Sequence, residues 1–432
     1  MSKIEIKFIQ KFYFANLRQS RDKILLSIVF LLSFLSSSTF AQVKLVPHKV
    51  SLKNGKTFNL NLPANYEIIP AAENLNRVRF FAKSPDGRIF VTDMFDMSDN
   101  RKGTVYILDT FDAKTGKFGK IIPFMRNLRN PNSVAFYTDK RGQDWFYLAE
   151  TDKLTRYKFI RKSVAPTGTP QVLATFPDYG LNYKHGSWHM TRTIAFSPTG
   201  KLYISIGTSC DSCTEKKKEK DIRGVVLEMN ADGGERRVYA RNIKNAVGLK
   251  WIGNKPFATN EGVDHLGLDK PDDTFYELKE GANYGWSQCF QADGKVAVDP
   301  KYVKKKKPLP DCSFVPTAYA YFPAHSSALG FDFFDAKTSD KNLRNSFLVA
   351  LHGSTDRNWA RGYKIIAVRE GNRHQDFITG FVQGINIFGR PCDIMKLSPD
   401  SFLFSDDRGG VIYYVRKKAV NRKRRKAASP EF

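Results

Sequence analysis

The chain has 432 residues, of which 41% are hydrophobic and 13% are aromatic. That hydrophobic share is enough for a large core, and it excludes a chain that is disordered over most of its length. The net charge of +26 includes three dense clusters, Lys216–Lys220, Lys304–Lys307 and Arg416–Lys426, without the interleaved aromatic residues of a nucleic-acid-binding motif.

The N-terminus has the pattern of an export signal. A basic lead from Lys3 to Lys23 precedes an apolar run, Ile24–Leu35, and then small residues that end at Ala41. The run is too short to span a bilayer comfortably, and the Thr-Phe-Ala ending suits signal peptidase cleavage. We therefore predict that residues 1–41 are a signal peptide and that the mature protein is periplasmic or secreted. An uncleaved membrane anchor is the alternative.

One pattern recurs six times between residues 79 and 415: an apolar strand, a tight turn, a second apolar strand, a polar gap and a third strand. The clearest copy is Arg79–Thr92, which contains a Ser-Pro-Asp-Gly turn, followed by Gly103–Asp109. The other copies begin at Ser133, Thr193, Val247, Leu329 and Ile394. Apolar and polar residues alternate with period two, which is typical of strands, and the turn residues favour tight hairpins.

One such unit cannot bury both of its faces, so the copies must stack on one another. The six copies predict an all-β fold, a six-bladed β-propeller of four-stranded antiparallel blades over residues 42–416, with a basic tail over 417–432. An open β-solenoid is the alternative, and long insertions such as 279–328 argue against it. Propellers usually bind ligands at the central channel, so the residues that flank the innermost strands are the functional candidates.

The five cysteines are compatible with an exported protein, because disulfides persist in oxidising compartments, and their odd number leaves at least one thiol free. Cys289 and Cys312 flank a loop rich in Lys and Pro and are the best candidates for a disulfide. The Cys210-Asp-Ser-Cys213 pair could be a zinc half-site or a redox pair, but the further zinc ligands are missing. We expect a local disulfide or two structural thiols there.

Several predicted blades place a histidine or a cation just before the innermost strand. His189 precedes the third such strand, where it is either a proton acceptor or a hydrogen-bonded packing histidine. Lys244 and Asn245 precede the fourth strand, His325 the fifth and Arg390 the sixth. Positive and imidazole groups that converge on one channel favour an anionic cofactor or substrate.

The segment 260–273 is rich in carboxylates and turn residues. Hard oxygen ligands of this kind suit calcium. The segment lacks the spacing of a known calcium loop, so an acidic surface loop is an equal alternative.

Six phrases between His189 and Asp393 carry a resemblance to a known family. They are His189-x8-Pro-x-Gly-Lys-Leu-Tyr203, Asn245-Ala-Val-Gly-Leu249, Tyr284-Gly-Trp286 with Cys289, His325-Ser-x-x-Leu-Gly330, His352-Gly-Ser354 with Arg357 and Gly362-Tyr-Lys364, and Gly389-Arg-Pro-x-Asp393. In this order they resemble the dehydrogenases of glucose and sorbosone that depend on pyrroloquinoline quinone (PQQ), over most of residues 65–415. The sorbosone branch is the more similar, because it has a comparable paired-cysteine loop.

The resemblance implies that His189 is the general base, which takes a proton from a sugar or aldehyde-hydrate hydroxyl while hydride passes to the quinone. It also implies that Lys244, Asn245 and Arg390 contact PQQ. Cations at these positions would stabilise negative charge on the reduced quinone.

The resemblance implies further roles at the mouth of the same channel. His325 and Arg357 would line it, and the backbone carbonyls of Gly262 and Val263 would bind a calcium ion that holds and polarises PQQ.

Three positions depart from the pattern of the glucose-type members. Lys244 stands where Arg is usual, and Cys392 stands where a second Arg is usual. Thr208 stands where a carboxylate orients the base, and Asp211 is a candidate to replace that carboxylate. These departures bear on the affinity for the cofactor.

The sequence thus predicts a PQQ- and calcium-dependent oxidoreductase that acts on an aldose or sugar aldehyde. A calcium-dependent propeller hydrolase, such as a lactonase, and a non-catalytic sugar-binding propeller are the alternatives. No Cys-x-x-Cys-His haem motif is present, so we expect a separate periplasmic electron acceptor. We expect no nucleic-acid partner, and the basic clusters suit peripheral attraction to an anionic membrane surface.

Overall fold

Strands make up almost all of the regular structure in the computed structural model, with one short helix, α2 (Pro300–Val303), among the described residues. The structure describes residues 43–177, 189–303, 308–354 and 361–419. The predicted signal peptide, 1–41, and the tail beyond residue 419 lie outside them. Val43–Phe432 is assigned to one structural unit. No helix in the described part of the chain is long and apolar enough to cross a membrane.

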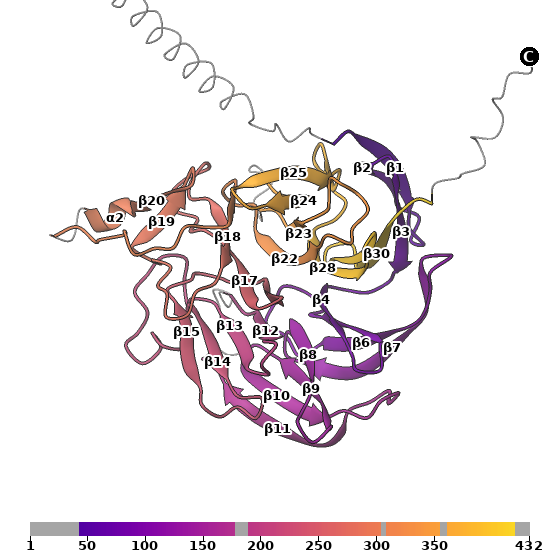
Figure 1. The fold of residues 1–432 in the computed structure, drawn as a ribbon, viewed down its shortest axis with the longest axis horizontal. Helices are drawn as coiled ribbons and strands as arrows, with labels where there is room; N and C mark the ends of the chain where they lie inside the picture. The colour runs from indigo at the N-terminus through magenta and orange to yellow at the C-terminus, as the bar shows by residue number, and fades with distance from the viewer. Residues whose placement is uncertain (1–42, 178–188, 304–307, 355–360, 420–432) are drawn as a thin grey trace, which may run out of the picture. The chain divides into compact units, whose positions relative to one another are not determined.

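Six four-stranded antiparallel sheets form the blades of a β-propeller (Figure 1). Blade 1 consists of β4 (Val78–Lys83), β5 (Ile89–Asp93), β6 (Gly103–Asp112) and β7 (Lys117–Leu128). Blade 2 consists of β8 (Ser133–Thr138), β9 (Asp144–Ala149), β10 (Lys153–Lys158) and β11 (Thr167–Thr175). Blade 3 consists of β12 (Arg192–Phe196), β13 (Leu202–Ile206), β14 (Val225–Met229) and β15 (Arg237–Arg241).

The second half of the ring repeats this order. Blade 4 consists of β16 (Leu249–Ile252), β17 (Lys255–Asn260), β18 (Asp273–Glu277) and β21 (Ala320–Phe322). Blade 5 consists of β22 (Ala328–Phe334), β23 (Ser346–Leu351), β24 (Lys364–Arg369) and β25 (Arg373–Ile378). Blade 6 consists of β28 (Pro391–Ser398), β29 (Ser401–Asp406), β30 (Val411–Lys417) and β3 (Tyr66–Ala72). The predicted fold class is confirmed.

The first strands of the blades line the centre of a closed ring. β4, β8, β12, β16, β22 and β28 each contact the next, and β28 contacts β4. Hydroxyl groups near the centre tie neighbouring blades together: Thr92 Oγ1 donates to the carbonyl of Asn132 at 2.8 Å, and Ser405 Oγ donates to that of Arg79 at 2.6 Å. Because these groups are buried, each hydrogen bond avoids the cost of an unsatisfied polar atom.

The ring closes through a strand from the other end of the chain. β3 pairs antiparallel with β30, in a register that places Tyr66 opposite Lys417 and Ile68 opposite Val415. The last blade therefore combines three strands from the C-terminal end with one from the N-terminal end. This pairing covers the strand edge that β30 would otherwise expose.

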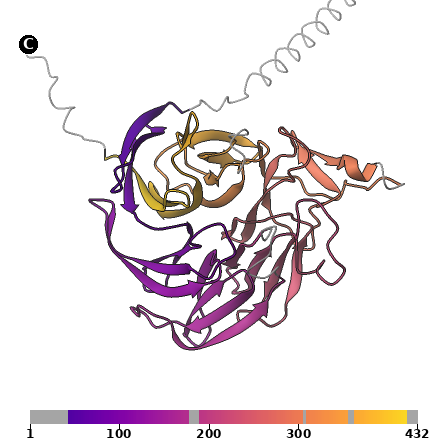
Figure 2. The ribbon, with the colours of Figure 1, turned by 180° about the vertical axis from the view of Figure 1, so that it is seen from behind.

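Three hairpins stand outside the blades. β1 (Leu45–Ser51) and β2 (Thr57–Pro63) form the first, and Asn61 of β2 bridges to Thr379 beside blade 5. β19 (Cys289–Ala292) and β20 (Lys295–Val298) form the second, which lies with α2 in the insertion of blade 4 and projects from the ring in both views (Figures 1 and 2). The third joins β26 (Val382–Gln383) and β27 (Asn386–Ile387).

The hydrophobic core lies between adjacent blades. Phe90 of blade 1, for example, packs edge-on against Phe124 of its own blade and contacts Phe146 of blade 2, and all three are buried. The second strands β5, β9, β13, β23 and β29 are buried at every position, because a blade covers each of their faces. The period-two alternation expected from the sequence is therefore lost in these strands.

Candidate functional site

A cavity of about 410 Å³ lies in this unit and brings together residues that are far apart in sequence. Its size is in the range that accommodates a small molecule or cofactor. Six residues singled out from the sequence line it: His189, Lys244, Asn245, Gly262, His325 and Arg390. Val263 lines a smaller adjacent pocket instead, and Arg357 lies outside the described residues.

His189 lies just before β12, in a backbone conformation with a φ of +49°. Its Nδ1 is 2.9 Å from the carbonyl oxygen of Thr208 and 3.1 Å from the Thr208 hydroxyl. A carbonyl can only accept, so Nδ1 carries the proton and Nε2 is the basic nitrogen. Gly207 is needed beside this ring, since a Cβ there would lie 2.4 Å from the His189 Cβ.

The surroundings of His189 keep its imidazole neutral. Desolvation, followed by the positive charge of Lys244, lowers the pKa of His189 to about 3. The ring is therefore unprotonated at neutral pH, as a proton acceptor must be. An anion bound beside Lys244 would offset its charge and raise this pKa toward neutrality.

Thr208, rather than Asp211, holds the histidine in place. The Asp211 carboxylate lies 3.0 Å from Lys244 Nζ and 3.2 Å from His265 Nδ1, and it accepts the backbone N–H of Asp264 at 2.9 Å. Burial would raise the pKa of Asp211, but Lys244 and these hydrogen bonds hold it below its ordinary value. Asp211 is the candidate from the sequence to orient the histidine in place of the expected carboxylate. Its contacts are with Lys244, His265 and Asp264 instead.

Lys244 is buried, with 4% of its surface exposed. Besides the Asp211 contact, its Nζ donates to the carbonyl oxygen of Gly262 at 2.5 Å. This arrangement does not fit a calcium ion held by the carbonyls of Gly262 and Val263, because an ammonium already occupies the Gly262 oxygen and would repel a second cation. Among the described residues, no group of three or more His, Cys, Asp or Glu side chains could hold a metal.

Two carboxylates of the segment 260–273, the half-buried Glu261 and the buried Asp273, lie near Lys244. Glu261 accepts the Asn245 side-chain amide at 2.7 Å, and burial raises its pKa. Asp273 accepts the backbone N–H groups of Gly262 at 2.7 Å and Ser327 at 2.6 Å. Burial, and then the charge of Glu261, raise the pKa of Asp273 to about 7. This side of the cavity is acidic.

The opposite side of the ring, where blades 5, 6 and 1 meet, is rich in cations. Arg390 is buried and donates through Nε to the carbonyl of His352 at 3.2 Å and through Nη2 to the carbonyl of Gly353. His352 Nε2 lies 2.8 Å from Asp407, and desolvation and Arg390 lower the pKa of His352 to about 3.

Sequence reasoning missed Arg77, Arg79 and Asp407. Both arginines line the cavity, and Asp407 binds both of them. The available signal was the Arg-x-Arg spacing at the head of an innermost strand, since alternate residues of a strand share a face. Asp407 follows β29, far away in sequence, so that nothing local pointed to the contact.

His325 lies before β22 in a left-handed conformation, with a φ of +63°. Its Nε2 is 2.8 Å from the carbonyl of Gly267, and its Nδ1 is 3.3 Å from Asp264. The imidazole thus lies at the cavity wall, as predicted, and is held by the segment 260–273.

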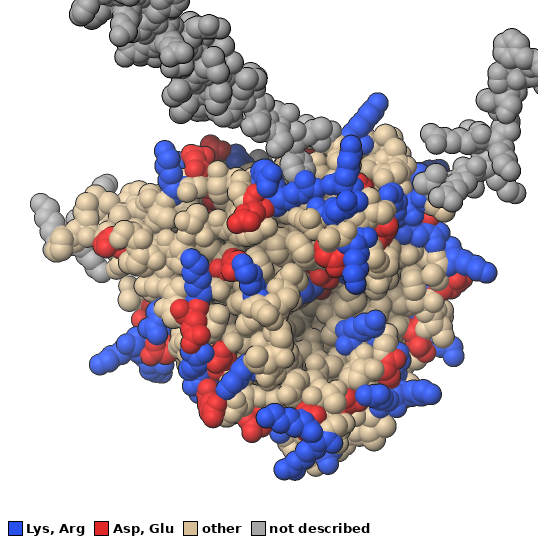
Figure 3. Space-filling model, in the orientation of Figure 1, with Lys and Arg blue, Asp and Glu red and all other residues tan. Residues whose placement is uncertain are grey.

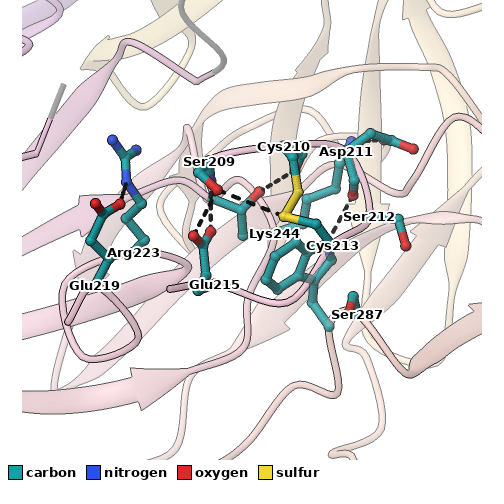
Figure 4. Close-up of a disulfide and its surroundings, with 12 residues drawn as sticks. Ser209, Cys210, Asp211, Ser212, Cys213, Glu215, Glu219, Arg223, Lys244 and Ser287 are labelled. Atoms are coloured by element: carbon teal, nitrogen blue, oxygen red, sulfur yellow. Dashed lines mark hydrogen bonds and ion pairs between the residues drawn. A yellow bond between two sulfur atoms is a disulfide. The ribbon is translucent and has the colours of Figure 1, made fainter. Parts of the chain in front are cut away.

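The cysteines pair as two disulfides. Cys289 is bonded to Cys312, which confirms the predicted bridge, and Cys210 is bonded to Cys213 (Figure 4). The loop of the shorter bridge lies against the site, because Asp211 within it binds Lys244 and the Cys210 carbonyl accepts the Thr208 hydroxyl at 2.8 Å. Cys392 is a buried free thiol, and burial raises its pKa. Two disulfides are typical of proteins that fold in an oxidising compartment.

Basic residues are spread over the face of the unit seen in Figure 3, with acidic residues among them. They do not gather into one stripe on that face.

The fold places the chain among six-bladed propellers whose solved members include sugar-oxidising enzymes. No protein-family model matches the chain. Among curated proteins, an uncharacterized protein of Borreliella burgdorferi is 26% identical over 361 residues, which cover 77% of this chain and 90% of the relative.

Three solved structures illustrate the similarity. The calcium structure of the Trichoderma reesei carbohydrate-active enzyme of family AA12 has a TM-score of 0.65 and 16% identity, and covers 88% of this chain and 100% of that one. The holo PQQ domain of Coprinopsis cinerea pyranose dehydrogenase has a TM-score of 0.65 and 15% identity, with coverages of 85% and 98%. The PQQ-bound aldose sugar dehydrogenase of Streptomyces coelicolor has a TM-score of 0.56 and 18% identity, with coverages of 82% and 99%. At these identities the likeness establishes the shared fold.

Proposed function

We propose that this chain is a PQQ-dependent dehydrogenase that oxidises an aldose or a sugar aldehyde of the glucose or sorbosone type. The observation that carries the proposal is the cavity, where a neutral histidine with an oriented ring shares one wall with a buried lysine. Two of the solved propellers with this fold are described as PQQ-bound or as holo PQQ domains, which supports the choice of cofactor.

The residues of the cavity fit an anionic, planar quinone. Lys244 and Arg390 are buried cations on two sides of the cavity. Arg390 has no carboxylate partner among the described residues, and a buried cation of this kind is costly unless an anion joins it. Asn245 adds a side-chain amide beside Lys244. When bound, PQQ would supply the electron-accepting quinone, which the protein's own side chains lack.

His189 would remove the proton from the reacting hydroxyl of the substrate. The Thr208 carbonyl keeps the Nδ1–H tautomer, so that Nε2 accepts the proton. Lys244, a buried and preorganised cation, would stabilise negative charge that builds up at the reacting centre.

The cellular setting belongs to the same proposal. Residues 1–41 would direct export, and both disulfides would then form in the oxidising compartment. A separate periplasmic acceptor would remove the electrons. The basic surface would recruit an acidic acceptor or an anionic membrane.

The test begins with the purified chain and PQQ. PQQ is titrated into the protein while the fluorescence of its five tryptophans is followed, once with calcium and once with EDTA. Dye reduction is then assayed with a panel of aldoses and aldehydes. We expect saturable PQQ binding and substrate-dependent dye reduction. If PQQ does not bind under either condition, the proposal is wrong and a hydrolase or sugar-binding role takes its place.

The His189→Ala variant tests the assignment of the base. General-base catalysis contributes about 10²–10⁴-fold, so we expect activity to fall by that order while PQQ still binds. His374→Ala is the matched control, because His374 is exposed on β25 of blade 5. Equal activity of the two variants would remove His189 from the mechanism.

A further inference from the structure

Arg77 and Arg79 converge on one buried carboxylate. Arg77 Nη1 lies 2.6 Å from Asp407 Oδ2, and Arg79 Nη1 lies 2.7 Å from the same oxygen. Arg79 Nε also donates to the Asn132 side chain at 3.0 Å. These bonds fix both guanidinium groups against the cavity wall, which both residues line.

Both carboxylate oxygens of Asp407 have bonding partners. Its second oxygen lies 2.8 Å from His352 Nε2, and its side chain has no exposed surface. Burial alone would raise the pKa of Asp407, yet His352, Arg79 and Arg77 hold it far below its ordinary value. Asp407 therefore carries one full negative charge, and that charge is shared between two arginines.

A third guanidinium at this place has no carboxylate partner among the described residues. Arg390 donates to the backbone carbonyls of His352, Gly353 and Ser354. Burial, together with the charges of Arg77 and Arg79, lowers its pKa, although Asp407 acts in the opposite direction. The described side chains thus place three arginines around Asp407 and a neutral His352, and Glu261 is the further carboxylate whose charge reaches Arg79.

Such an excess of largely buried positive charge is unfavourable unless an anion binds there. The excess lies where blades 6 and 1 meet, because Arg390 precedes β28, Arg79 lies on β4, and these strands are neighbours. Lys244 precedes β16, the first strand of blade 4, which in the order of the ring lies opposite the place where blades 6 and 1 meet. A ligand that spans the cavity would therefore meet the three arginines at one end and, at the other, Lys244 together with the carboxylates around it.

Arg79 also accounts for the departure at position 392. Cys392 lies on β28, which contacts β4, the strand that carries Arg79. An arginine from the adjacent blade thus occupies the neighbourhood in which the resembling enzymes carry one of their own.

We propose that Arg77 and Arg79, together with Arg390, form a binding site for a carboxylate group at the side of the cavity between blades 6 and 1. Guanidinium groups bind carboxylates through paired, charge-assisted hydrogen bonds, which suits them better than any single ammonium. The proposal deepens the function proposed above and rests on it. The carboxylate belongs either to the quinone cofactor or to an acidic sugar such as a uronate.

The experiment compares Arg77→Gln and Arg79→Gln with wild type. PQQ affinity is measured by tryptophan quenching, and KM is measured for glucose and for glucuronate in dye reduction. Arg101→Gln is the matched control, because its side chain is 51% exposed. Arg79→Lys, which keeps the charge, is included in case Arg79→Gln fails to fold, and thermal melting identifies that failure.

We expect both Gln variants to lose a charge-assisted contact and to bind the carboxylate about ten-fold more weakly, or worse. If PQQ affinity falls while KM for glucose stays constant at saturating PQQ, the carboxylate is that of the cofactor. If PQQ affinity is unchanged and KM rises for glucuronate alone, it is that of the substrate.

If the PQQ affinity and the KM values of both Gln variants equal those of Arg101→Gln, the carboxylate site is wrong. The proposed dehydrogenase function would still stand. Failure of wild type to bind PQQ would instead overturn the proposed function. Direct titration of glucuronate, followed by thermal shift of wild type and Arg77→Gln, then decides the anion site by itself. If wild type binds no PQQ and is not stabilised by glucuronate either, the carboxylate site is overturned together with the proposed function.

Discussion

The Nδ1 atom of His189 is held by the carbonyl and the hydroxyl of a single threonine, Thr208. In the resembling enzymes a carboxylate is expected at that position, and a carboxylate would also raise the basicity of the imidazole. A neutral carbonyl orients the ring without adding negative charge. The tautomer is thus preserved while the pKa of His189 remains low.

At the same scale, Asp273 is a carboxylate whose protonation couples to folding. Burial and Glu261 raise its pKa from 3.8 to about 7. Its contribution to stability is therefore complete below pH 3.8 and is lost as the pH rises through about 7, because the unfolded chain releases the proton first.

Asp273→Asn removes this titration. The free energy of unfolding of wild type, relative to that of Asp273→Asn, should fall by up to about 4 kcal/mol between pH 4 and pH 7. Urea unfolding at several pH values measures it. Asp269→Asn is the control, because the Asp269 side chain is 79% exposed. A relative stability that stays constant or rises with pH would contradict the assignment.

At the scale of elements, the sequence located three strands of every blade but did not locate the fourth. The outer strand β11 (Thr167–Thr175) is mostly exposed, and its residues lack a clear apolar alternation. An outer strand packs little of its surface against a neighbouring blade, so that selection for apolar residues is weak there. The buried second strands, by contrast, are apolar on both faces and are easy to recognise.

The two disulfide loops should have different effects. Cys289–Cys312 spans 23 positions and Cys210–Cys213 spans 3, so chain entropy predicts losses of about 3 and about 2 kcal/mol when each bridge is replaced by two alanines. Ligand binding should respond in the reverse order, because the shorter loop carries Asp211, which binds Lys244.

Denaturant unfolding and PQQ titration of Cys289→Ala/Cys312→Ala and Cys210→Ala/Cys213→Ala measure the two effects, and each double variant is the control for the other. If both variants bind PQQ equally well, the shorter loop does not position the site.

At the scale of the whole molecule, the ring depends on the pairing of β3 with β30. Without β3, blade 6 would lack its outer strand and β30 would have a free edge that can pair with another chain. We expect a chain that lacks residues 43–72 to aggregate or to unfold without cooperativity, as measured by size-exclusion chromatography and thermal melting. Removal of residues 420–432, which lie outside the described structure, is the control. A monomeric, cooperatively folded product without residues 43–72 would contradict this closure.

The amino-acid sequence by itself determined the class of fold and six of the residues that line the cavity. Strand periodicity and turn residues are local properties, and a six-fold repeat leaves few ways to bury both faces of each sheet. His189, Lys244, Asn245, His325 and Arg390 could be found for the same reason, since each lies at an equivalent place before an innermost strand.

Only the tertiary structure decided which charges meet. Arg77 and Asp407 are 330 positions apart and touch because the ring closes on itself. Lys244 lies on the Gly262 carbonyl, where the resemblance placed calcium, because the connection between blades 3 and 4 lies against the β17–β18 loop of blade 4. Electrostatic energy depends on distance and burial, and a linear chain specifies neither until it has folded.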